Sequence, residues 1–174
     1  KGVSRVRSLD IILELGKVEA TQEDKDKWLI QKNEDYLSYL VDMNETEILP
    51  GVMKVLKFLK VNDQPIALGS ASKNARPILE KTGILPFFYV IVYGNDVVNA
   101  KPDPEVFLHA ARLLNVTNED SIVFEDSVAG IQAANIAKMM SIGIGDEETL
   151  HEAQYNFKDF TEMNSTFLEL LINN

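Results

Sequence analysis

The adjacent carboxylates Glu125 and Asp126 are the residues of this chain best placed for chemistry. They follow the apolar run 122–124 and precede Ser127, where a helical pattern begins. A short apolar run that ends in charged residues predicts a buried strand of a parallel α/β sheet, and such sheets bind ligands at the carboxyl ends of their strands. Two neighbouring carboxylates repel each other unless a cation neutralises them, and Mg²⁺ prefers oxygen ligands. We therefore weigh two interpretations, a divalent metal site and a helix cap made by Asp126 or Ser127.

A second candidate site follows another apolar run, at 65–68. Gly69 and Ser70 end this run, and Ala71-Ser72-Lys73-Asn74 leads into a helical pattern. Small residues let the backbone approach an anion, hydroxyl and amide groups donate hydrogen bonds to it, and the amino end of a helix adds favourable charge. The segment predicts a phosphate site, although serine and asparagine are also ordinary residues at the entry to a helix.

Two cations, Lys101 and Arg5, could act beside such a phosphate. Lys101 precedes Pro102, which keeps this lysine out of the helix that follows, so its ammonium could offset charge on a phosphoryl group. Arg5, next to Ser4, could hold a phosphate through two parallel hydrogen bonds. Lys32 lies in an amphipathic helical pattern and on this pattern alone belongs to a solvated face. Taken singly, each of these residues could equally be an ordinary surface cation.

The elements that would position these residues fall into two groups. Residues 1–43 are helical in pattern, with one helix over 4–15 and a second that begins after a capping box of Thr21 and Asp24. Pro50-Gly51 opens the next helix, so we place a boundary at 44–49. From residue 50 onward strands and helices alternate, which predicts an α/β fold with a parallel sheet covered by helices on both faces. The expected strands are 65–70, 89–93, 122–124 and 139–144, and the expected helices are 75–82, 104–114, 127–137 and 165–172.

Composition narrows the possible functions. The formal net charge of −10 disfavours broad contact with nucleic acid or anionic lipid, because both would be repelled. The absence of cysteine excludes thiol chemistry, disulfides and thiolate zinc sites. No apolar run approaches the ~20 residues of a membrane span. We expect a cytoplasmic protein that binds a small molecule and acts as a monomer, without a nucleic-acid or membrane partner.

The three loops, in this order, resemble the haloacid dehalogenase superfamily of phosphotransferases. Ser70 matches its second motif, Lys101 its third and Glu125-Asp126 its fourth. Within this superfamily, Lys1-Gly2-Val3-Ser4-Arg5 with Ser8, together with 70–74, is similar to the β-phosphoglucomutase family. The resemblance implies a Rossmann-like core over 50–174, a helical cap domain of which 1–43 is the larger part, and a hinge at 44–49.

The resemblance also implies an activity and a role for each residue. The expected reaction is a magnesium-dependent isomerisation of a hexose phosphate through a sugar bisphosphate. Asp126 would bind Mg²⁺ with Glu125 beside it, and the phosphoryl group being transferred would contact Ser70, Ala71 and Lys101. The second phosphate of the bisphosphate would contact Arg5, Ser72, Lys73 and Asn74. The sugar would face the cap residues Lys1, Gly2, Val3, Ser4, Ser8 and Lys32.

One motif of the superfamily does not occur in these 174 residues. It is an Asp-x-Asp at the end of an amino-terminal strand, where the first aspartate accepts the phosphoryl group and the second is the general acid and base. Asp24-Lys25-Asp26 has this spacing but begins a charged helix with no apolar strand before it. We expect this chain alone to be inactive and the missing segment to have been cleaved or omitted. A sugar-phosphate phosphatase and a catalytically inactive phosphosugar-binding module are the alternative functions.

Overall fold

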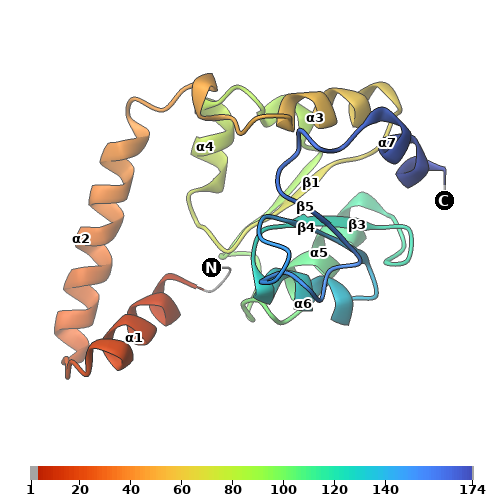
Figure 1. Cartoon of the computed structure of the whole chain (residues 1–174). Helices are drawn as coiled ribbons and strands as arrows, with labels where there is room; N and C mark the ends of the chain where they lie inside the picture. The colour runs from red at the N-terminus through yellow and green to blue at the C-terminus, as the bar shows by residue number, and fades with distance from the viewer. Residues whose placement is uncertain (1–3, 174) are drawn as a thin grey trace.

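Five short parallel strands form the centre of the structure, a computed structural model that describes residues 4–173 (Figure 1). They pair in two sheets within this part of the chain, β1 with β2 and then β3, β4 and β5 in order. In the register, Leu68 lies opposite Ile91, and Glu125 lies opposite Gly143, which in turn lies opposite Asn156. The strands are β1 (Ala67–Gly69), β2 (Val90–Val92), β3 (Ile122–Glu125), β4 (Met140–Ile144) and β5 (Tyr155–Phe157).

Helices cover both faces of these strands, as the alternating pattern predicted. Residues of β3 alternate between the two faces. Val123 packs in an apolar cluster with α5 and α6, whereas Ile122 and Phe124 pack in a second cluster with α3 and α7. The parallel α/β prediction is therefore confirmed. The helices are α3 (Val52–Val61), α4 (Ala75–Lys81), α5 (Glu105–Leu114), α6 (Val128–Ile136) and α7 (Ser165–Ile172), and a short 3₁₀ turn, η2, covers Leu85–Phe87.

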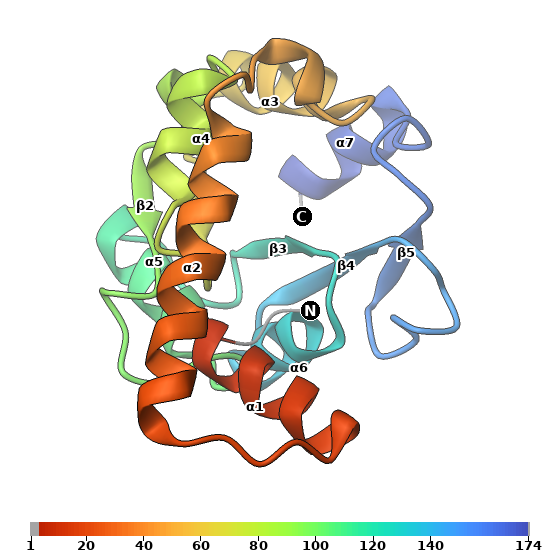
Figure 2. The same ribbon diagram turned by 90° about the vertical axis from the view of Figure 1, so that its left-hand side faces the viewer.

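The first two helices lie together at one side of the molecule, as both views show (Figures 1 and 2). Ser4 caps α1 (Arg5–Gly16) by accepting a hydrogen bond from Arg7 N. Thr21 and Asp24 form the predicted capping box of α2 (Gln22–Leu40). The Asp24 side chain thus forms a helix cap, which agrees with the sequence prediction that Asp24-Lys25-Asp26 is not the catalytic Asp-x-Asp motif. Helix α1 buries none of its residues, and in α2 only Leu40 is buried.

The segment between α2 and α3 is fixed at its carboxyl end. It contains a 3₁₀ turn, η1 (Glu45–Glu47), and leads to Gly51, whose φ of 84° favours glycine. A Cβ at Gly51 would lie 2.5 Å from the backbone carbon of Phe160. A side chain cannot fit there, so this glycine lets the start of α3 pack directly against the 160–161 backbone.

The structure differs from the sequence predictions at several boundaries. Strands β1, β2 and β4 are shorter than predicted, β3 extends one residue further, to Glu125, and β5 was not predicted. Helix α5 begins at Glu105, one residue later than expected, and its N-cap position is Pro104 and not Asp103. Asp103 Oδ1 accepts a hydrogen bond from Glu105 N at 2.9 Å. Within residues 4–173, none of the helices combines the length and apolar character that crossing a membrane requires.

Candidate active site

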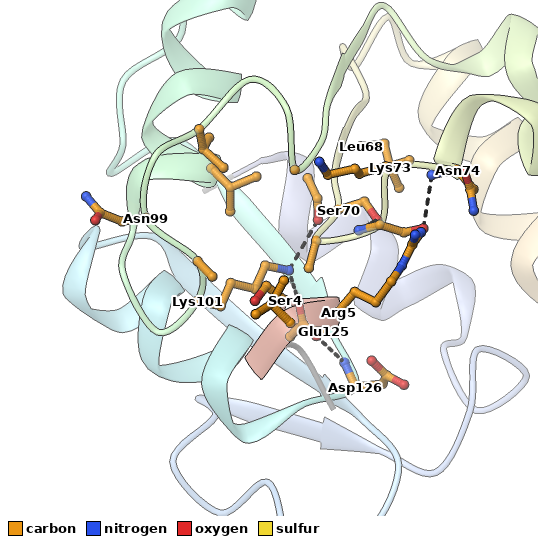
Figure 3. Close-up of a pocket in the computed structure, with 18 of the residues that line it drawn as sticks. Ser4, Arg5, Leu68, Ser70, Lys73, Asn74, Asn99, Lys101, Glu125 and Asp126 are labelled. Carbon is orange, nitrogen blue, oxygen red and sulfur yellow. Dashed lines mark hydrogen bonds and ion pairs between the residues drawn. The ribbon is translucent and has the colours of Figure 1, made fainter. Parts of the chain in front are cut away.

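A cavity of about 710 Å³ lies where the carboxyl ends of β1, β3 and β4 meet helices α1 and α2 (Figure 3). Its walls come from segments far apart in the sequence, the 68–74 loop, the 97–101 loop, the tip of β3 and the two amino-terminal helices. The three predicted loop tips therefore converge on one cavity, which is open to a ligand that contacts both the strand tips and the helices.

The loop that follows β1 is held in place by its own serine side chains. Ser70 N donates to the carbonyl of Val92 at 2.9 Å, which extends the pairing of β1 with β2. The Ser70 hydroxyl then accepts from Ser72 N, and the Ser72 hydroxyl accepts from Asn74 N, each at 3.1 Å. These turns precede α4 and fix the loop before any ligand is bound.

Lys101 is a buried cation at the floor of the cavity. Its side chain is only 6% exposed, and its Nζ donates to Glu125 Oε2 at 2.7 Å and to the carbonyl of Gly69 at 3.2 Å. The loops after β1 and β3 are thus joined through this one ammonium group. A solvated loop lysine would not be buried in this way, so the structure favours a role for Lys101 inside the cavity.

Glu125 is fully engaged in hydrogen bonds. Its Oε1 accepts from the backbone N–H of Asp126 and from both the N–H and the hydroxyl of Ser127, at 2.7–3.2 Å. The close approach of α6 is possible because residue 130 is glycine, and a Cβ there would lie 2.1 Å from Glu125 Cδ. Glu125 therefore holds Lys101 and the amino end of α6 together.

The two sequence interpretations of the 125–127 segment can now be separated. Ser127 is the residue that caps α6, because its hydroxyl accepts a hydrogen bond from Gly130 N at 3.1 Å. Asp126 is exposed and lines the cavity. Its carboxylate chemistry fits a magnesium ligand, since Mg²⁺ is commonly held by one or two carboxylates together with substrate phosphate. Within the described part of the chain, no group of three or more metal-ligating side chains surrounds it.

Helices α1 and α2 contribute cations to the same cavity. Ser4, Arg5 and Lys32 line it, and Figure 3 shows Ser4 and Arg5 in the same space as Lys101 and Asp126. Helix α2 also contacts the 70–74 loop directly, because Asn74 Nδ2 donates to Asn33 Oδ1 at 3.1 Å. An ion pair between Lys25 and Asp10, 2.7 Å apart, joins α1 to α2.

Most of the residues predicted from the sequence therefore meet at one site. Ser8 lies on α1 outside the cavity lining, and Lys1, Gly2 and Val3 lie outside the described residues. Sequence reasoning missed Asn33 and Asn99. Asn33 lies next to Lys32 in the helical pattern that by itself indicates a solvated face, and Asn99 lies two residues before Lys101 in a loop of which only the lysine was considered. The residues brought together as predicted are Ser4, Arg5, Lys32, Ser70, Ala71, Ser72, Lys73, Asn74, Lys101, Glu125 and Asp126.

Glu105 holds the loop that carries Asn99 and Lys101. Its two carboxylate oxygens accept hydrogen bonds from Val98 N at 3.0 Å and from Asn99 N at 2.8 Å. These hydrogen bonds lower the pKa of Glu105 below its usual value, and the one from Val98 N has the larger effect. The ionised carboxylate thus fixes the cavity wall from the first turn of α5.

The two hydrogen bonds that the Glu105 carboxylate accepts from Val98 N and Asn99 N, called here the Glu105 clamp, predict that the stability lost on replacing Glu105 depends on pH. Folding lowers the pKa of the Glu105 carboxyl group. The stabilisation of the folded protein by the ionised carboxylate is therefore complete above the unfolded-state pKa, and it is lost as the pH falls through the lower, folded-state pKa. We expect Glu105→Gln to be less stable than the wild type at neutral pH, and the difference to shrink below about pH 4. Urea denaturation from pH 7 to pH 3 would measure it. Glu119→Gln, at an exposed position before β3, is the matched control, and a Glu105→Gln difference that is unchanged at pH 3 would contradict the clamp.

Comparison with known proteins agrees with this geometry. A model of the haloacid dehalogenase-like hydrolases matches residues 3–138. The chain is 35% identical over 173 residues to a β-phosphoglucomutase of Bacillus subtilis, an alignment that covers 98% of this chain and 75% of that protein. The chain belongs to the haloacid dehalogenase-like hydrolase family. The superfamily predicted from the three loop motifs is therefore confirmed.

Other members of this family extend the comparison. The structure of a β-phosphoglucomutase from Clostridium difficile superposes with a TM-score of 0.91 and 37% identity, covering 99% of this chain and 78% of that one. The chain is also 31% identical over 159 residues to a phosphorylated carbohydrates phosphatase of Thermotoga maritima, covering 87% of this chain and 71% of that protein. Relatives of both kinds, mutase and phosphatase, are thus about one third identical to this chain.

Proposed function

We propose that the full-length protein is a β-phosphoglucomutase that interconverts β-glucose 1-phosphate and glucose 6-phosphate through β-glucose 1,6-bisphosphate. The observation that carries this proposal is the distribution of cations around one cavity. Lys101 lies at the strand tips, whereas Arg5 and Lys32 come from the helices and Lys73 from the 70–74 loop. A sugar with a phosphate at each end needs two separate anion sites, and this cavity offers cations for both.

At the strand tips, the transferring phosphoryl group would contact Ser70, the N–H of Ala71 and Lys101. Lys101 is already held by Glu125 and the Gly69 carbonyl, so its charge requires little reorganisation when negative charge develops on the phosphoryl oxygens. Phosphoryl transfer depends mainly on positioning and on charge stabilisation of this kind. Mg²⁺, held by Asp126 with the substrate phosphate, would neutralise further charge on the phosphoryl group.

At the far side, the second phosphate would contact Arg5, Ser72, Lys73 and Asn74, and the sugar would contact Ser4 and Lys32. We propose that residues 1–43 act as a cap domain that closes on the 50–174 core about a hinge at 44–49. The Asn33–Asn74 hydrogen bond would then hold the closed form at the phosphate loop. Closure would exclude water, which favours transfer to the sugar over hydrolysis.

The decisive experiment compares two activities of the full-length protein. The family's Asp-x-Asp nucleophile does not occur in these 174 residues, so the assay must use the complete gene product. β-Glucose 1-phosphate is supplied with a trace of the bisphosphate, and glucose 6-phosphate is followed with a coupled dehydrogenase while inorganic phosphate is measured in parallel. We expect isomerisation to be faster than phosphate release by a wide margin. Phosphate release that equals or outpaces isomerisation would reject the mutase.

A sugar-phosphate phosphatase is the second candidate, and the 31% identity to the Thermotoga maritima phosphatase supports it. The same cavity would then hold one phosphate at Lys101 and admit water as the final acceptor. Glucose 6-phosphate distinguishes the two functions, because a phosphatase hydrolyses it steadily whereas a mutase only equilibrates it with β-glucose 1-phosphate.

Replacing Lys73 tests the second phosphate site. Lys73 is exposed on the phosphate loop, away from the Lys101 end of the cavity (Figure 3). We expect Lys73→Ala to raise the concentration of bisphosphate needed for half-maximal activity about tenfold, with a smaller effect on kcat, because it removes one charge-assisted contact to the non-reacting phosphate. Steady-state kinetics at varied bisphosphate would measure this. Lys57→Ala, at an exposed lysine of α3, should behave like the wild type, and equal kinetics of the two variants would remove Lys73 from the site.

A further inference from the structure

The aromatic ring of Phe107 lies directly against the Lys101 ammonium group. Phe107 is on the first turn of α5 and is 7% exposed. Lys101 Nζ lies 4.5 Å from the centroid of its ring, within the range of a cation–π interaction. Such contacts are stronger when the cation is removed from water, and the Lys101 side chain is only 6% exposed.

Three partners together fix the ammonium group. Glu125 Oε2 and the Gly69 carbonyl accept hydrogen bonds from Nζ, and the Phe107 ring supplies a third, uncharged contact. Two of the three N–H donors are therefore used within the protein. Lys101 lines the cavity on its remaining side, where a phosphoryl oxygen would be bound.

Strand β1 is built to accommodate the ring. A Cβ at residue 69 would lie 3.0 Å from both Cδ1 and Cε1 of Phe107, so a larger residue there would require the ring to shift by a few tenths of an ångström. Gly69 thus has two effects on this arrangement. Its carbonyl accepts a hydrogen bond from Lys101, and its lack of a side chain leaves space for the Phe107 ring. The ring of Phe107 thus packs closely against the carboxyl end of β1.

We propose that Phe107 is a positioning residue, whose ring face holds the Lys101 ammonium at the point where the phosphoryl group is transferred. This inference rests on the proposed phosphoryl-transfer function, because it assigns Phe107 its effect through Lys101. Packing alone would account for an apolar residue at 107, but it would not require an aromatic face directed at a buried cation. An electrostatic role predicts that activity depends on the electron density of the ring at constant shape.

The test is a series of fluorinated phenylalanines at position 107 of the full-length protein. Successive fluorine substitution weakens the negative face of the ring while the ring keeps its shape. We expect kcat to fall stepwise, by about tenfold between phenylalanine and its trifluoro form, with KM changed by less than about twofold. Phe107→Tyr, which keeps the ring, should retain activity, and Phe107→Leu should lose at least as much as the trifluoro form. Equal kcat across the fluorinated series would overturn the proposal.

Two further measurements distinguish the electrostatic effect of the Phe107 ring from a loss of stability, and they test it independently of the enzyme's activity. Met139→Ala removes a buried side chain of the same apolar cluster without touching Lys101, so it should lower stability but preserve kcat in the folded protein. The Cε protons of Lys101, observed by NMR in the wild type, should be shifted upfield by the ring and should lose this shift in Phe107→Leu. A wild type without the upfield shift overturns the proposal, whatever the enzyme's activity.

Failure of the proposed function would look different from failure of this inference. A wild-type protein that turns over neither hexose phosphate, yet shows the upfield shift, would reject the mutase and the phosphatase. The fluorinated series is then measured by its affinity for inorganic phosphate, which should weaken stepwise if the ring positions Lys101. An affinity that is constant across the series would again overturn the role of Phe107.

Discussion

Replacing Asp126 with alanine is expected to lower the kcat of the full-length protein by a factor of about 10³ or more. Asp126 is the exposed carboxylate at the tip of β3, beside the buried pair of Glu125 and Lys101. Its removal leaves the cavity with cations for phosphate but without the carboxylate that we propose for Mg²⁺. The coupled assay for glucose 6-phosphate measures the loss, and calorimetric titration with Mg²⁺ should show weaker binding in the same variant.

The control for this prediction is an exposed acidic residue at the other end of the same strand. Glu119 precedes β3 and lies outside the cavity, so Glu119→Ala removes one negative charge without altering the site. Both variants should unfold at nearly the same urea concentration as the wild type, because neither replaced side chain is buried. Wild-type turnover in Asp126→Ala would remove this residue from the proposed mechanism.

The strand tips were predictable from the sequence because each combines two independent signals. An apolar run marks the strand, and polar or charged residues at its end mark the site, as in Leu68 to Ser70 and Phe124 to Asp126. Ser70 and Asp126 each follow the carboxyl end of a parallel strand, where such folds bind ligands, and their side chains line one cavity although β1 and β3 pair in different sheets. Lys101 followed because proline excludes its predecessor from the helix.

The contacts between these tips were not predictable in the same way. Nothing in the sequence indicates that Glu125 turns inward to Lys101 while its neighbour Asp126 faces the cavity, because the choice depends on Gly130 and Ser127 in the next helix. Asn33 was missed for a related reason, since its partner Asn74 is distant in the sequence. Strand β5 has a polar residue, Asn156, between two aromatic residues, so it lacks the apolar run that marked the equally short β1 and β2.

Replacing Glu125 with alanine is expected to lower the free energy of unfolding by about 3–5 kcal/mol. Glu125 and Lys101 are 10% and 6% exposed, so removal of the carboxylate would leave an uncompensated ammonium in the interior. The backbone N–H groups of Asp126 and Ser127 would lose their acceptor as well. Urea denaturation at neutral pH measures the change, and a loss below about 1 kcal/mol would contradict the assignment of Glu125 as the partner of a buried charge.

A double replacement shows whether the stability lost in Glu125→Ala comes from the uncompensated charge of Lys101 or only from lost packing. Glu125→Gln with Lys101→Met removes both charges while it keeps similar volumes, so it should recover much of the stability lost in Glu125→Ala. Catalysis should stay abolished, because Lys101 itself is gone. If the cost were only the cavity left by Glu125, then Glu125→Gln alone would be as stable as the double variant. We instead expect this single variant to lie clearly below it, because the buried ammonium of Lys101 would keep a neutral amide in place of its carboxylate.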